Sequence, residues 1–227
     1  MTTKKNTNST NMILHLGRLS DTIFALAMAL TIFGFDFPKF AELASNMEIN
    51  QFLISQLEPL ENYLITFVIL AFYWIDHVKQ FSHYRKTDEI HLWLYIVYLM
   101  CLFIVPFSNV LIMYFPDNNI VQICYSINIF IIGLFSFINW TYATYKNRLV
   151  DTDLDKQTIK YIGINSLIEP IVALITIIVA LINPSLWNLS WASIIIFYII
   201  VEIFVKKPVD IDSNKHNQLE DIGETKQ

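Results

Sequence analysis

Long stretches without any charged residue dominate the chain. Residues 92–116, 120–145 and 170–201 contain none. About 20 apolar residues of α-helix cross the hydrocarbon of a bilayer, so each of the first two stretches predicts one spanning helix. The third is long enough for two helices, and an Asn-Pro-Ser turn at 183–185 predicts the connection between them. A helix of a soluble bundle would present a polar face at every turn, so the pattern predicts a membrane protein.

Two further spans are predicted in the first half of the chain, although charges interrupt their apolar pattern. The first contains Arg18 and Asp21, and the second is free of charge only over 62–75. Charges near helix ends, or paired within a bundle, are compatible with a span. The fold class is therefore all-α, a polytopic membrane protein with six transmembrane helices. The expected spans are 13–35, 57–82, 90–114, 119–146, 158–182 and 186–205.

Basic residues set the expected topology, because cytoplasmic loops carry the excess of lysine and arginine. Several lysine or arginine residues occur in each of four segments: the expected N-terminal tail 1–12, the second-to-third connection, the fourth-to-fifth connection and the polar tail 206–227. The opposite side contains only Lys39. We therefore expect a multi-pass protein of the cell membrane with both termini cytoplasmic, a transmembrane domain over 13–205, and a disordered acidic tail after it.

The composition narrows the possible functions. Charged residues make up 15% of the chain, against about 25% in a soluble domain. Cys101 and Cys124 lie inside apolar runs without metal-ligand spacing. No nucleophile with a base and no cluster of metal ligands is evident. We expect no enzyme activity, no cofactor, no metal and no nucleic-acid partner. The acidic outer loops indicate either ordinary solvation or a vestibule that concentrates cations.

The first span holds the most informative chemistry. Ionisable groups this far into a membrane helix usually have partners or face water. Arg18 and Asp21 are three residues apart and can meet on one face, so a buried ion pair is one interpretation. Further along, Leu26, Leu30 and Phe33 share a face. On an isolated helix that stripe indicates core packing.

This stretch resembles the first-helix signature of the transmembrane protein 175 family, the lysosomal potassium channels and their bacterial relatives. The signature runs Arg-x-x-x-Phe-Ser-Asp, then a small residue, an apolar residue and Phe-Ala-Ile. Ser20, Asp21, Phe24 and Ala25 match it position for position, and Leu26 stands where the family has isoleucine.

The resemblance extends over about residues 13–205. Trp74, His77 and Phe81 are similar to the second-helix pattern Trp-x-x-His-x-x-x-Phe. Three dipeptides resemble the third and fifth helices: Trp93-Leu94, Pro106-Phe107 and Glu169-Pro170. Length, number of spans and topology agree with the bacterial six-helix branch of the family.

Some positions depart from the family pattern. The family arginine falls at His15 and its phenylalanine at Leu19, while Arg18 lies one turn further on. Tyr95 replaces an asparagine that relatives often have. In the family, polar groups of the first three helices form a cytoplasmic-side network linked to gating and stability. The resemblance therefore implies a network of His15, Arg18, Ser20, Asp21, Trp74 and His77, in an altered form.

The function implied by the resemblance is a potassium-preferring cation channel. Four subunits would form a homotetramer in the lipid bilayer, with the first helix of each lining a central pore. Leu26, Leu30 and Phe33 would then form stacked apolar rings, with Leu26 at the narrowest. No Thr-Val-Gly-Tyr-Gly segment is present, so a hydrophobic constriction would replace a carbonyl filter. Ser20 and Asp21 would hold the helix through Trp74 and His77 and would not touch ions.

Two alternatives remain open from the sequence. One is a proton-conducting channel of the same build, with protons as the transported ion. The other is a secondary cation transporter that uses Arg18, Asp21 and Glu169 as a relay. His77 allows two interpretations, a switch that titrates near physiological pH or a hydrogen-bonded structural histidine.

Overall fold

The computed structural model describes residues 2–34 and 46–205, and almost all of them lie in helices joined by short turns. The expected disorder of 206–227 lies outside the described residues. The helices are α1 (Thr2–Leu30), η1 (Thr31–Gly34), α2 (Asn46–Ser55), α3 (Leu57–His83), α4 (Glu89–Phe103), α5 (Val105–Tyr114), α6 (Asn119–Thr144), η2 (Tyr145–Asn147), α7 (Lys156–Asn165), α8 (Ile168–Ile182), η3 (Pro184–Leu186), α9 (Trp187–Ser190) and α10 (Ser193–Phe204).

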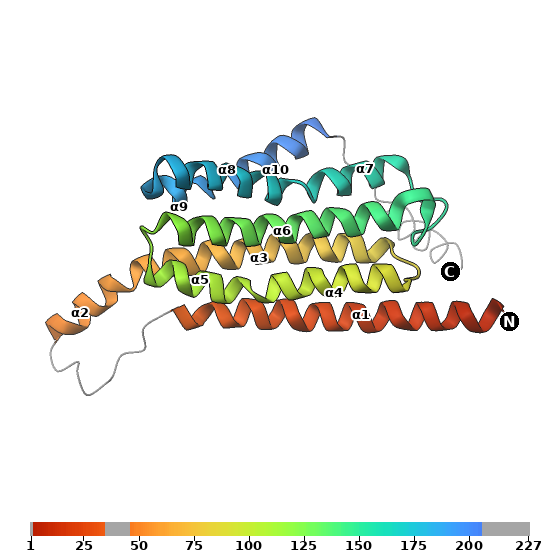
Figure 1. Cartoon of the computed structure of the whole chain (residues 1–227), viewed down its shortest axis with the longest axis horizontal. Helices are drawn as coiled ribbons and strands as arrows, with labels where there is room; N and C mark the ends of the chain where they lie inside the picture. Colours follow the sequence, from red (N-terminus) through yellow and green to blue (C-terminus); the bar gives the residue numbers. More distant parts are fainter. Residues whose placement is uncertain (1, 35–45, 206–227) are drawn as a thin grey trace, which may run out of the picture.

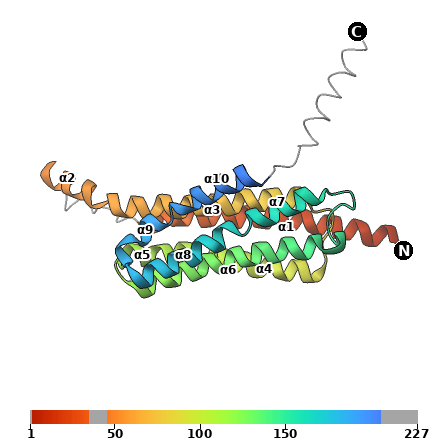
Figure 2. The same cartoon turned by 90° about the horizontal axis from the view of Figure 1, so that it is seen from above.

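Six helical segments are long and apolar enough to cross a membrane, which confirms the all-α fold with six spans. They are Asn11–Phe33, Ile49–His83, Glu89–Tyr114, Asn119–Asn147, Lys156–Ile182 and Pro184–Phe204. The second begins earlier than the predicted residue 57, because only Gln56 separates α2 from α3. In both views α2 projects beyond the end of the bundle (Figures 1 and 2).

Proline interrupts two of the spans. Proline has no backbone N–H, and its ring clashes with the carbonyl of the preceding turn. The third span changes from α4 to α5 at Ile104, two residues before Pro106. The fifth changes from α7 to α8 at 166–167, just before Pro170. These breaks let each span bend around its neighbours.

The spans form layers, with α1 along one edge of the bundle and the α7, α8 and α10 segments along the other (Figure 1). Helix α3 and the α4–α5 pair lie beside α1, and α6 packs on α4, α5 and α8. The α6–α8 contact is close, because a Cβ atom added at Gly133 would lie 2.4 Å from Cδ of Pro170. Within the described bundle, this arrangement leaves α1 with neighbours on one side only.

Hydrogen bonds between side chains connect the interior of the bundle. The Thr66 hydroxyl lies 2.7 Å from Oδ1 of Asn109 and 2.9 Å from the Tyr125 hydroxyl. Thr176 and Trp187 both donate to Oγ of Ser126, at 2.9 and 3.0 Å. The hydrocarbon contains no water to satisfy polar groups, so these contacts specify how α3, α5, α6, α8 and α9 fit together.

Candidate functional site

Helix α1 has two different faces. Phe24, Ala27 and Thr31 are buried against the bundle, where α1 contacts α3, α4 and α5. No helix among residues 2–34 and 46–205 covers the opposite face, which lies at the outer edge of the described bundle (Figure 1). Exposed side chains there include Arg18, Asp21, Thr22, Ala25, Leu26, Ala29 and Phe33.

The uncovered face of α1 differs chemically from a lipid-facing surface. The exposed face of α10 provides the comparison, since most of its side chains are large and aliphatic, such as Ile195, Ile199 and Ile203. Its exposed charge, Glu202, lies near the C-terminal end of the helix. On α1, by contrast, Arg18 and Asp21 would be costly in lipid. Its alanines allow another helix to approach closely. The composition of this face of α1 therefore favours contact with protein or water over contact with lipid.

The predicted constriction residues lie on or beside this uncovered face. Leu26 is 48% exposed and Phe33 is 61% exposed, while Leu30 is half-buried. Helix α1 tightens to a 3₁₀ turn at Thr31, which changes the direction of Phe33 relative to the α-helical period. Within the described part of one subunit no element covers Leu26 or Phe33, so any ring that they form requires further subunits.

The polar residues of α1 do not form the ion pair between Arg18 and Asp21 that the sequence allowed; they have other partners. Nε1–H of Trp74 on α3 donates to Oδ1 of Asp21 at 3.3 Å. No ion pair joins Arg18 to Asp21 within the described part of α1. The Ser20 hydroxyl is buried but donates to the Leu16 carbonyl of its own helix at 2.8 Å. The structure therefore connects α1 to α3 through Asp21 and Trp74, and not through Ser20 or Arg18.

An aromatic cluster behind α1 contains His77. Its Nδ1 lies 2.5 Å from the hydroxyl oxygen of Tyr95 on α4. Its ring centroid lies 5.3 Å from that of Phe24 on α1 and 4.4 Å from that of Phe81. His77 thus joins three helices, and Tyr95 is its hydrogen-bonding partner. His15 is exposed and takes no part in this cluster. Sequence reasoning identified Tyr95 only as a departure from the family pattern.

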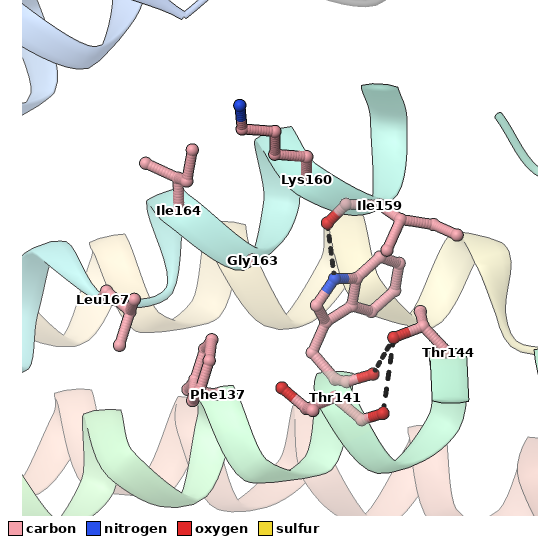
Figure 3. Close-up of a pocket in the computed structure, with 9 residues that line it drawn as sticks. Phe137, Thr141, Thr144, Ile159, Lys160, Gly163, Ile164 and Leu167 are labelled. Atoms are coloured by element: carbon pink, nitrogen blue, oxygen red, sulfur yellow. Dashed lines mark hydrogen bonds between the residues drawn. The ribbon is translucent and has the colours of Figure 1, made fainter. Parts of the chain in front are cut away.

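A groove of about 270 Å³ lies away from α1, between α6 and the α7–α8 segment (Figure 3). Its walls are mainly apolar. Trp140, one of the lining residues, donates a hydrogen bond to the Ile159 carbonyl at 3.0 Å. The Lys160 side chain points away from Phe137 and Thr141 (Figure 3). The groove therefore lacks the convergent polar groups that a small-molecule site needs, and it is separate from the uncovered face of α1.

Loss of the Asp21–Trp74 contact should loosen α1. We expect Trp74→Phe to destabilise the protein by about 1 kcal/mol, because it removes a hydrogen bond to a carboxylate at a partly exposed site. Thermal unfolding in detergent measures this. Trp93→Phe is the matched control, since Trp93 is exposed on α4. Equal destabilisation by the two substitutions would contradict a bond that holds α1.

The helices that form this site also carry the similarity to known proteins. Residues 15–106 match the sequence model of the family described as endosomal/lysosomal potassium channel TMEM175. No curated protein matches the chain. The matched residues include α3 and α4, as well as most of α1.

Two solved structures share the fold. One is a lysosomal potassium-selective channel TMEM175 homolog from Chamaesiphon minutus, with a TM-score of 0.71, 18% identity, and coverage of 85% of this chain and 99% of the homolog. The other is a variant of the potassium channel MtTMEM175 bound to a nanobody–MBP fusion, with a TM-score of 0.54, 18% identity, and coverage of 82% and 88%. The resemblance inferred from the sequence is confirmed: residues 15–106 of this multi-pass membrane protein match the TMEM175 family model, and its fold is similar to that of two TMEM175 channel structures over most of its length.

Proposed function

We propose that this chain is the subunit of a potassium-preferring cation channel of the cell membrane, with α1 lining the pore. The observation that carries the proposal is the uncovered face of α1, where charged, hydroxyl and small side chains replace the large aliphatic residues of α10. The TMEM175 family match supports the same function.

The proposed channel is a homotetramer. One α1 helix cannot enclose a conduit, so several copies must bring their uncovered faces together. Closed rotational symmetry is the usual arrangement of identical subunits. Fourfold symmetry would place four copies of Leu26 around one axis, with Leu30 and Phe33 nearby in the direction of the C-terminal end of α1.

The proposed selectivity element is this apolar constriction. A ring of leucine side chains excludes water when narrow and conducts only when wide enough to hold it. Potassium gives up its hydration water more readily than sodium, so such a ring should prefer potassium modestly. We propose that Asp21 with Trp74, and Phe24 with His77, fix α1 at the distance from the axis that sets the width of the ring.

The remaining polar residues of α1 would belong to the pore entrance. His15, Arg18 and Ser20 lie N-terminal to the proposed constriction, and the first two are exposed. Both termini are proposed to be cytoplasmic, from the distribution of lysine and arginine. A reporter fused at Asn118 should then report the outside, and a cytoplasmic signal there would overturn the orientation.

Ion flux from liposomes tests the proposed function. Purified protein should release potassium faster than sodium along matched gradients, and native mass spectrometry should detect a tetramer. Flux that depends only on the pH gradient would overturn potassium conduction in favour of a proton channel. Saturable flux coupled to a second ion would replace the channel by a transporter. A monomer as the conducting species would overturn the assembly.

A further inference from the structure

A second polar cluster lies inside the subunit, on the side of α3 that faces away from His77. Asp76 on α3 and Glu169 on α8 are both almost completely buried. The Tyr198 hydroxyl on α10 donates a hydrogen bond to Oε1 of Glu169. The Tyr198 ring stacks on Phe72 of α3, with ring centroids 4.5 Å apart. Three helices thus meet around two carboxyl groups.

Each of these carboxyl groups has one oxygen without a partner. Oδ2 of Asp76 and Oε2 of Glu169 are buried and accept no hydrogen bond. The other oxygen of Asp76 lies 3.2 Å from Nζ of Lys79. Burial of an unpaired charge is far more costly than burial of a paired one. Two carboxylates and one ammonium group leave one negative charge uncompensated.

The surrounding groups do not supply the missing positive charge. Helix α3 presents Tyr73 in addition to Asp76 and Lys79, and α4 presents Tyr98. The Tyr73 hydroxyl already donates to the Ile129 carbonyl at 2.7 Å. Helix α6 approaches through Gly133, which has no titratable side chain. Lys79 is therefore the one described cation close to the carboxyl groups.

We propose that Asp76 and Glu169 form a proton-binding site in which the pair holds one proton. A proton supplies the missing charge without occupying space, and its O–H can bridge to the oxygen that lacks a partner. A metal ion needs more ligands, and no group of three or more potential metal ligands occurs among the described residues. The site is separate from the proposed pore, because Asp76 and His77 point to different sides of α3.

The bound proton joins α8 and α10 to α3. Its loss leaves two interacting carboxylates inside the bundle, compensated only by Lys79 and the Tyr198 hydroxyl. At neutral pH the folded state holds this proton, whereas the unfolded chain has already released it. Stability therefore falls as the pH rises through the titration of the site.

Two measurements on the full-length protein in detergent test this site. The infrared spectrum of the wild type at neutral pH should contain the C=O band of a protonated carboxylic acid, and Glu169→Gln should remove it. Glutamine mimics the protonated carboxyl, so this variant should also lose the decline in unfolding temperature that we expect of the wild type as the pH rises above neutral. Glu89→Gln, at an exposed position of α4, should leave both properties as in the wild type.

The outcomes distinguish a bound proton from a bound metal cation. If Glu169→Gln fails to fold, the infrared band of the wild type and its loss in Asp76→Asn decide the question. A wild type without the acid band would overturn the proposal. An unfolding temperature that depends on potassium or sodium concentration, with no acid band, would assign the site to a metal cation instead. None of these readouts requires ion conduction, so they are independent of the proposed channel function.

Discussion

Truncation of Leu26 to alanine is expected to raise cation flux and to reduce the preference for potassium over sodium. The smaller side chain widens the proposed ring and lowers the free energy required to wet it. A decrease of about 1.4 kcal/mol in that barrier corresponds to about a tenfold increase in rate. Leu26→Asn should raise flux as well, because the amide hydrates the ring without widening it much. Bilayer recordings give both the conductance and the permeability ratio.

The matched control for Leu26 is Ile199 on α10. Both side chains are about half exposed in the isolated subunit, at 48% and 53%. Leu26 lies among Asp21, Ala25 and Ala29, whereas Ile199 lies mainly among large aliphatic side chains such as Ile195 and Ile203. Ile199→Ala should leave flux and the permeability ratio unchanged, because Ile199 faces lipid in the proposed tetramer. An unaltered permeability ratio in a well-folded Leu26→Ala tetramer would show that Leu26 does not line the narrow part of the pore.

Substitution of Gly133 by alanine should have the largest effect on folding. The added Cβ would lie 2.4 Å from Cδ of Pro170 and 3.0 Å from the Tyr73 hydroxyl oxygen. The proline ring is rigid and belongs to the helix break at the start of α8, so α6 and α8 would have to separate. Overpacking of this kind costs about 1–3 kcal/mol and sometimes more. The yield of folded protein and its thermal unfolding measure the loss.

Gly163 on α7 provides the comparison for Gly133. A Cβ added there would meet the Trp140 ring no closer than 3.5 Å, an ordinary van der Waals contact. Alanine also favours the helix over glycine by up to about 1 kcal/mol. Gly163→Ala should therefore be neutral or slightly stabilising. If both alanine variants behave alike, close approach of α6 to Pro170 does not limit the fold.

The number and the approximate limits of the spans could be predicted from the amino-acid sequence alone. Runs such as 120–145 have no charge to place in water, so they can only cross the membrane or lie buried, and their length leaves one span each. The first-helix pattern around Ser20 and Asp21 likewise indicated the family before any contact was known. The period of an α-helix also placed Leu26 and Phe33 on a common stripe.

What each face of a helix meets depends on the tertiary structure. Periodicity orders the side chains around one helix but does not identify the neighbouring helices. From the sequence, Asp21 could therefore pair either with Arg18 or with a residue of another helix. In the structure its partner is Trp74 on α3. The partner of His77 lies 18 residues away. Glu169 comes near Asp76 only through the packing of the α7–α8 span, whose α7 part contacts α3. The uncovered state of one face of α1 follows from its position at the edge of the bundle, which depends on how all six spans pack together.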